Sequence, residues 1–230
     1  MAKSLIRFSN GTRSNLHPAK KRTGGGAVFR QLQSFFPPLL DAEKQLIEDS
    51  LEGVIQKCLN NFSHSSNKYF SQEKEGRKVV RFDAFHSIQW MTFLYYLSHE
   101  LYLKKSNLCD KVYYLNKIMH SVDLFYAIEL PEIWSAEHPL ASVMGRAKYS
   151  NGFFFYQGCT VGGTKDREGN IYYPEIEENV KMFSNSSILG RCHIGKNVNI
   201  GAGCIVKNQD VPENSTVFGQ SPNLIIKPNK

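Results

Sequence analysis

Apolar residues recur every six positions along the C-terminal half of the chain. Four positions after each of the first five comes a small or apolar residue. The two series are Ile176, Met182, Ile188, Ile194, Ile200, Val206 and Val180, Ser186, Cys192, Val198, Cys204. An α-helix or a half-buried strand would give a shorter period, whereas a triangular coil with three flat faces of six residues gives a period of six. The pattern therefore predicts a left-handed parallel β-helix with one inward apolar residue on each face.

The same register can be followed towards the N-terminus. Val143, Tyr149, Phe155 and Val161 are expected at the first inward position, with Ala147, Phe153 and Cys159 four residues later. Fifteen residues, which is not a multiple of six, separate Val161 from Ile176. We therefore expect one loop of about three to nine extra residues to leave the coil at this point.

Residues 39 to about 122 have helical patterns instead. One stripe at helical spacing contains Ile47, Leu51, Val54, Ile55 and Cys58, with Asp41 as its expected N-cap. Two further apolar segments cover residues 85–103 and 112–119, and the polar residues 63–76 are expected to form a loop. The expected fold class is α+β, with a helical domain followed by a left-handed β-helix that carries one extra loop.

The positive charge is concentrated at the N-terminus. Residues 1–38 hold no acidic residue and seven basic ones, which are Lys3, Arg7, Arg13, Lys20, Lys21, Arg22 and Arg30. The whole chain has 28 − 21 = +7, so residues 39–230 are neutral at 21 − 21 = 0. We therefore expect a flexible basic tail over residues 1–38, a helical domain over 39–122 and the β-helix over 123–230.

Three roles stay open for this tail: a solvated extension, a surface that meets anionic membrane or polysaccharide, and a targeting segment. No basic face with interleaved aromatic residues is present, so a nucleic acid is not an expected partner. Five cysteines without paired spacing indicate reduced thiols in a cytoplasm. The longest apolar segment is interrupted by His99 and Glu100, so no membrane span is expected. A peripheral position at the inner face of the membrane stays open.

Several short motifs add a family resemblance. They are Gln157-Gly158-Cys159-Thr160-Val161-Gly162-Gly163-Thr164, Tyr173-Pro174-Glu175-Ile176, Ile188-Leu189-Gly190 and Ile200-Gly201-Ala202-Gly203-Cys204-Ile205-Val206. Upstream lie Phe85-His86-Ser87-Ile88-Gln89, Ser121-Val122-Asp123 and Glu137-His138. In order and spacing, residues 80–228 resemble the hexapeptide-repeat acyltransferases, and within them the serine acetyltransferases.

The resemblance implies an acetyl-CoA-dependent O-acetyltransferase. Acetyl transfer to a hydroxyl needs a base, and imidazole has a suitable pKa. Family position assigns the base to His138 and the carboxylate that orients it to Asp123. Glu137 stands where the family has an aspartate at the acceptor.

The resemblance also implies a site for coenzyme A, between neighbouring coils of two subunits of a homotrimer. Pairing of two trimers stays open. Ser184, Ala202 and Gly203 match the family's positions for the donor, and Lys207 and Lys227 match positions where basic residues approach its phosphates. Gly162 and Gly163, which are also assigned to the donor site, begin the extra loop, where a backbone N–H could stabilise the developing oxyanion. A resident metal is not expected, because a zinc site of three histidines would need more than the two in the coil.

The sequence departs from the family on the acceptor side. The family has Asp-Arg-His-Pro where this chain has Ile171-Tyr172-Tyr173-Pro174. An arginine there would bind the amino-acid carboxylate, whereas Tyr172 and Tyr173 offer aromatic faces with hydroxyl tips that suit a sugar ring. The chain also ends in Lys227-Pro228-Asn229-Lys230 rather than in the family's isoleucine tail, so cysteine synthase is not an expected partner.

The main functional hypothesis is therefore O-acetylation of a sugar hydroxyl, in a surface polysaccharide. The alternative is serine O-acetylation in cysteine biosynthesis. Two further alternatives are N-acylation of an amino sugar and a β-helix used for metal-dependent hydration or as a scaffold.

Overall fold

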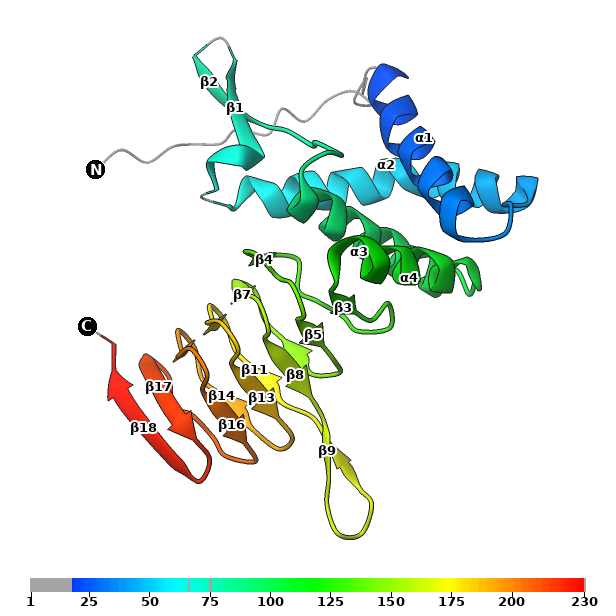
Figure 1. Ribbon diagram of the computed structural model, residues 1–230. Coiled ribbons are helices and arrows are strands. Elements are labelled where there is room, and N and C mark those ends of the chain that lie inside the picture. Colours follow the sequence, from blue (N-terminus) through cyan, green and yellow to red (C-terminus); the bar gives the residue numbers. More distant parts are fainter. Residues whose placement is uncertain (1–17, 66, 75, 230) are drawn as a thin grey trace.

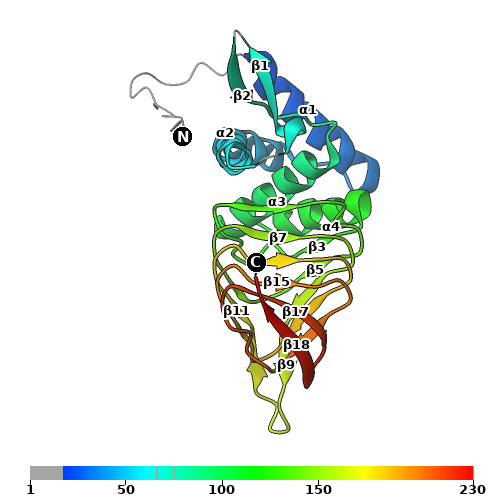
Figure 2. The same cartoon turned by 90° about the vertical axis from the view of Figure 1, so that its left-hand side faces the viewer.

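Helices and a coil of strands form two stacked parts of the molecule. The computed structural model describes residues 18–65, 67–74 and 76–229. The helices lie at one end, and the coil extends away from them (Figure 1). Figure 2 shows the turns of the coil stacked beneath helices α3 (Ser87–Leu103) and α4 (Leu108–His120). The fold class predicted from the sequence is confirmed.

The predicted tail is not flexible along its whole length. Residues Pro18–Phe35 form helix α1, which packs against α2 (Asp41–Ser63). Val28 and Leu32 are fully buried at a spacing of four residues, so one face of α1 belongs to the helical core. The expectation of a flexible tail is therefore wrong for this stretch. Residues 1–17 lie outside the described part of the chain.

Two details of the helical part also differ from the prediction. Helix α2 is capped at Leu40 rather than at Asp41, because the Glu43 carboxylate accepts a hydrogen bond of 2.8 Å from the Leu40 N–H. The predicted loop contains a 3₁₀ turn (Lys68–Phe70) and a hairpin of β1 (Ser71–Lys74) and β2 (Arg77–Val80).

Eleven strands of the coil build its three faces. The first face contains β6 (Lys148–Tyr149), β11 (Glu175–Ile176) and β14 (His193–Ile194). The second contains β4 (Trp134–Ala136), β7 (Phe153–Phe155), β12 (Lys181–Met182) and β15 (Asn199–Ile200). The third contains β5 (Val143–Met144), β8 (Thr160–Gly162), β13 (Ser187–Leu189) and β16 (Ile205–Lys207). All neighbours within a face pair in parallel.

Three other strands complete the two ends of the coil. Short β3 (Asp123–Leu124) extends the third face towards the helices by pairing with β5. At the far end, β17 (Ser215–Gln220) pairs in parallel with β15, and β18 (Asn223–Pro228) folds back on β17 as an antiparallel strand. The exposed edge of the last turn is thereby covered by a hairpin.

Strand pairing confirms the six-residue register. Ile188 pairs with Val206, which is 206 − 188 = 18 residues later and hence one turn of three faces. Val161 pairs with Ile188, and 188 − 161 = 27 leaves nine residues beyond one turn. These residues form the hairpin of β9 (Thr164–Lys165) and β10 (Ile171–Tyr172), which projects away from the helices in Figures 1 and 2. The predicted excursion from the coil is confirmed.

The register slips by one residue in the first turn. Met144, and not Val143, pairs with Val161 and is fully buried, while 39% of Val143 is exposed. The turn from Met144 to Val161 has 161 − 144 = 17 residues, one fewer than the regular repeat. The assignment of Val143 to the inward series is therefore wrong.

Asparagine residues form several corners of the coil. Asn179, Asn185, Asn197, Asn208 and Asn214 have φ between 50° and 61°. This left-handed conformation is tolerated by asparagine better than by most residues. The Asn179 amide donates to the Asn197 side chain at 3.1 Å, and the Asn197 amide donates to that of Asn214 at 2.9 Å. This ladder links successive turns.

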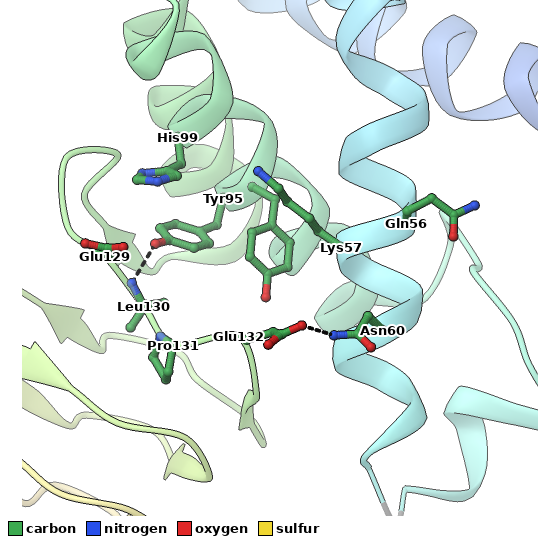
Figure 3. Close-up of a pocket in the computed structure, with 10 residues that line it drawn as sticks. Gln56, Lys57, Asn60, Tyr95, His99, Glu129, Leu130, Pro131 and Glu132 are labelled. Atoms are coloured by element: carbon green, nitrogen blue, oxygen red, sulfur yellow. Dashed lines mark hydrogen bonds between the residues drawn. The ribbon is translucent and has the colours of Figure 1, made fainter. Parts of the chain in front are cut away.

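The helical part is fixed on the coil through residues around one cavity of about 450 Å³ (Figure 3). The Tyr95 hydroxyl donates to the Ile128 carbonyl and accepts from the Leu130 N–H, both at 3.0 Å. The Asn60 amide donates to the Glu132 carboxylate at 2.7 Å. Side chains of α2 and α3 therefore hold the segment between β3 and β4, which sets the position of the first turn. Among the described residues, no helix has the length and apolarity needed to cross a membrane.

Candidate active site

His138 lies at the junction between the helices and the first turn of the coil. Its side chain is exposed and lines a cavity of about 420 Å³ together with Glu137, Pro139 and Leu140. The opposite wall comes from helices α3 and α4 and from the 3₁₀ turn that precedes α3. It consists of Asn67, Tyr69, His86, Ser87, Ile88, Met91, Met119 and His120. The predicted base therefore faces a cavity formed by both parts of the fold.

The backbone at His138 is unusual. Its φ is +48°, in the left-handed region, although a proline follows it. The turn is held by hydrogen bonds from Leu140 N–H to the His138 carbonyl at 2.7 Å and from Ala141 N–H to the Ser121 carbonyl at 2.8 Å. Left-handed non-glycine residues cost about 1–3 kcal/mol and concentrate at functional sites. Within the described part of the chain, the His138 imidazole has no hydrogen-bond partner.

Two more histidines face this cavity. His86 caps helix α3, and its ring meets Phe70 edge-on with the centroids 5.4 Å apart. His120 is bonded to the Asn116 side chain at 2.8 Å, and burial lowers the pKa of its imidazole to about 4. Burial also lowers the pKa of His86. Both rings are therefore neutral at pH 7 and have structural contacts, whereas His138 is free.

Asp123 does not hold His138 in this structure. Its carboxylate accepts hydrogen bonds from the Tyr113 hydroxyl at 2.6 Å and from the Lys117 ammonium at 2.8 Å. Both partners lie on α4, so the contacts join this helix to β3. Burial and the Asp123 carboxylate raise the pKa of Tyr113 to about 12. The expected hydrogen bond between Asp123 and His138 is absent among the described residues.

One corner of the coil carries both His138 and three of the expected donor residues. The Gly158 N–H donates to the Leu140 carbonyl at 2.8 Å, and the Asn185 N–H donates to Gln157 at 2.8 Å. One turn further, the Gly203 N–H donates to the Ser184 carbonyl at 2.9 Å. The corner column is therefore formed by residues 138–140, 157–158, 184–185 and 202–203. It leads from Ala202 and Gly203 past Ser184 to the His138 turn.

The remaining expected donor residues lie elsewhere. Gly162 and Lys207 both pair with Leu189, so they stack at the next corner. Gly163 follows Gly162 at the base of the hairpin, where an added Cβ would lie 2.7 Å from the Tyr173 ring. Lys227 pairs with Thr216 in the C-terminal hairpin. The structure therefore divides the expected donor residues between three places.

Tyr172 and Tyr173 lie at the hairpin corner, the corner of the coil from which the β9–β10 hairpin projects, and not in the His138 cavity. Tyr172 pairs with Thr164. Neither tyrosine lines the cavity that contains His138. The Arg191 guanidinium lies beside them, 5.3 Å from the centroid of the Tyr172 ring. The sequence alone did not point to this cation. Arg191 directly follows Gly190 and lies one turn of the coil after the start of the hairpin. Only the pairing between these turns reveals that Arg191 meets the hairpin.

Within residues 18–65, 67–74 and 76–229, no cluster of three histidine, cysteine or acidic side chains could hold an ion. All five cysteines are buried and free of disulfides, and Cys159, Cys192 and Cys204 fill inward positions of the coil.

Known proteins are similar to this chain in both the repeat and the sequence. Residues 173–208 match the family described as bacterial transferase hexapeptide (six repeats). The serine acetyltransferase of Staphylococcus xylosus is 27% identical over 173 residues, which cover 74% of this chain and 79% of that protein.

Solved structures agree in fold. A Neisseria gonorrhoeae serine acetyltransferase in complex with serine matches with a TM-score of 0.65 and 21% identity, covering 87% of this chain and 83% of the other. A Brucella abortus serine acetyltransferase in complex with coenzyme A gives 0.68 and 18%, covering 93% and 84%.

The names of these relatives favour the serine alternative over the saccharide acceptor of the main hypothesis, which receives no support from them. The same type of protein is indicated by the six-residue repeat, by the helical part before it and by the similarity to these proteins. The chain therefore carries the hexapeptide repeat of the bacterial transferases and shares the fold of the serine acetyltransferases, which is consistent with a hexapeptide-repeat acyltransferase of that group.

Proposed function

We propose that this chain is an acetyl-CoA-dependent O-acetyltransferase with His138 as its general base. The observation that carries the proposal is the position of the unpartnered His138 imidazole, which faces a cavity and stands at the end of the corner column. A histidine in such a place can meet an acceptor in the cavity and an acetyl group delivered along the column.

The donor fits the part of the corner column formed by Ser184, Ala202 and Gly203, because these residues are small. An added Cβ at Gly203 would meet open space, and Ala202 is exposed beside it. Backbone groups are therefore accessible to an extended amide-containing chain such as pantetheine. The exposed ammonium groups of Lys207 and Lys227 would attract the phosphates of coenzyme A.

The proposed reaction needs one base and one oxyanion site. The His138 imidazole removes the proton of the acceptor hydroxyl while that oxygen attacks the carbonyl carbon of the acetyl thioester. Backbone N–H groups at Gly162 and Gly163 would stabilise the developing oxyanion. The carbon–sulfur bond then breaks, and the departing thiolate takes the proton from His138.

A reaction that uses both the His138 base and this oxyanion site requires more than one subunit. Within one chain, Gly162, Gly163 and the hairpin lie at the corner that follows the His138 column. A homotrimer whose neighbouring coils place one subunit's hairpin corner against the next subunit's His138 column would complete the site. The trimer is part of the proposal, and pairing of trimers stays open.

L-Serine is the first candidate acceptor, because the similar proteins are serine acetyltransferases. The missing arginine next to Pro174 argues against it, since a serine carboxylate would lose a charge-assisted bond worth roughly 1.5–3 kcal/mol. The guanidinium of Arg191, held over Tyr172, offers a replacement cation from another part of the sequence. Glu137 in the cavity would meet the serine ammonium group.

A saccharide hydroxyl is the second candidate. Tyr172 and Tyr173 replace the charged residues of the family, and aromatic faces suit a sugar ring. This candidate predicts transfer to neutral acceptors that have no carboxylate.

An acceptor screen tests the proposal. Thiol release from acetyl-CoA is measured with L-serine and with free mono- and disaccharides. We expect release that depends on an acceptor and is lost in His138→Ala. Release that is unchanged in this variant would contradict the role of His138. Loss of serine transfer in Arg191→Ala, with Lys196→Ala as an exposed control, would support the serine acceptor.

A further inference from the structure

A second cavity adjoins the one that contains His138. Its volume is about 360 Å³, and it shares Asn67 and Glu137 with the first. Its other walls come from the end of α2, from the 3₁₀ turn and from the second face of the coil. They are His64, Ser65, Phe70, Ile133, Trp134, Ser135, Ala136, Gly152, Phe154, Tyr156, Lys181 and Phe183. The two cavities together have the size expected for a ligand larger than one amino acid.

Aromatic rings form the outer wall of this second cavity. Phe154 and Tyr156 meet edge to face at 4.9 Å, and Tyr156 stacks on Phe183 at 5.7 Å with 21° between the ring planes. Because 39% of Phe183 is exposed, it offers a free surface beside the corner column. Ordinary coil packing does not require this ring, since the inward position is already filled by Met182.

Polar groups stand around these rings. Burial of the Tyr156 hydroxyl, and after it the interaction with the Glu137 carboxylate, raises the pKa of Tyr156. The Lys181 ammonium is exposed and has no partner among the described residues. Flat apolar faces with donors and acceptors at their edges are typical of surfaces that bind sugar rings, since a sugar presents C–H faces and peripheral hydroxyls.

We propose that Tyr156 and Phe183 form a saccharide subsite of the acceptor site, which holds one sugar ring while the hydroxyl of a neighbouring ring is acetylated at His138. This inference rests on the proposed acetyl transfer and names its acceptor as a saccharide of at least two rings. It places the sugar-binding aromatic residues beside His138, whereas the sequence analysis assigns them to the hairpin.

Steady-state kinetics of the full chain test this subsite, with acetyl-CoA as donor and L-serine, glucose, cellobiose and N,N'-diacetylchitobiose as acceptors. We expect a disaccharide to be a better acceptor than serine. Phe183→Ala should raise the disaccharide KM about three- to tenfold, the loss of one aromatic contact, and leave the acetyl-CoA KM unchanged. Phe183→Tyr, which retains the ring, should restore the KM.

Phe218→Ala is the matched control. Phe218 lies on the same face of the coil, is 41% exposed and does not line the cavity. A Phe183→Ala variant with an increased acetyl-CoA KM, or one that no longer assembles, would overturn the inference. Transfer to serine and to none of the saccharides would also overturn it, while the proposed acetyltransferase would stand. Absence of thiol release with every acceptor would instead contradict the proposed function.

Discussion

At the scale of single residues, the three histidines of one cavity differ in what holds them. His86 caps a helix, and His120 is bonded to Asn116 in a buried position. His138 alone has an exposed imidazole without a partner, on a backbone in the left-handed region. The cavity therefore offers one imidazole without a hydrogen-bond partner among the described residues and two that support its walls.

Substitution of His138 should remove the chemistry and spare the fold. His138→Ala is expected to lower kcat by roughly 10²–10⁴-fold, the usual contribution of a positioned general base, because no other free imidazole lines the cavity. The affinity for acetyl-CoA, measured by calorimetry, should stay the same. His193→Ala is the control, since this exposed coil histidine lies 3.3 Å from Glu177 on another face. A kcat close to that of the unmodified chain would refute the role of His138.

Burial of His120 should make the fold sensitive to acid. Its pKa is about 4 in the folded chain and about 6.5 when unfolded. Between these values the unfolded chain binds more protons, so stability is complete above pH 6.5 and falls as the pH drops towards 4. Thermal unfolding between pH 7.5 and 4.5 should show this decline, and His120→Gln should reduce its slope. An unaltered slope would show that other groups cause it.

At the scale of elements, helix α1 shows how packing can order a segment that looks flexible. Its sequence contains three consecutive glycines, which disfavour a helix. The apolar positions Val28 and Leu32 are nevertheless buried against α2. The β9–β10 hairpin is the opposite case, since its nine extra residues were visible as an interruption of the repeat.

Helix α1 should therefore contribute to stability. Leu32→Ala is expected to lower the free energy of unfolding by about 2–5 kcal/mol, because it leaves a cavity in a packed core. Gln33→Ala, at the exposed neighbouring position, should change little. Urea denaturation of the two variants provides the comparison. Equal stability of Leu32→Ala and the unmodified chain would favour the flexible tail after all.

At the scale of the whole molecule, the coil separates groups that the proposed reaction needs together. His138 and Ser184 share one corner, while Gly162, Lys207 and the hairpin occupy the next. The helical part stands over the first turn and supplies the far wall of the His138 cavity. In the proposed reaction, a complete site therefore needs a neighbouring subunit.

Assembly should follow from this separation. Analytical ultracentrifugation at micromolar concentration is expected to give a trimer, or a multiple of it, and no stable monomer. A purely monomeric chain with full activity would contradict the shared site.

The sequence by itself determined the coil, its register from Tyr149 onwards and its excursion after Val161. Inward residues repeat every six positions because each flat face needs one apolar side chain, and this requirement is local. It also pointed to His138 and Glu137 as neighbours in one site, through their resemblance to a family motif. These features depend on short stretches of chain, so pattern and spacing reveal them.

Only the tertiary structure decided what faces what. The Asp123 carboxylate meets Tyr113 and Lys117 because α4 crosses β3, and Arg191 reaches Tyr172 because one turn of the coil stacks on another. The register slip at Val143 and the order of α1 depend on packing against distant residues. The cavity at His138 exists because helices and coil meet there, a contact between segments far apart in the chain that no local pattern encodes.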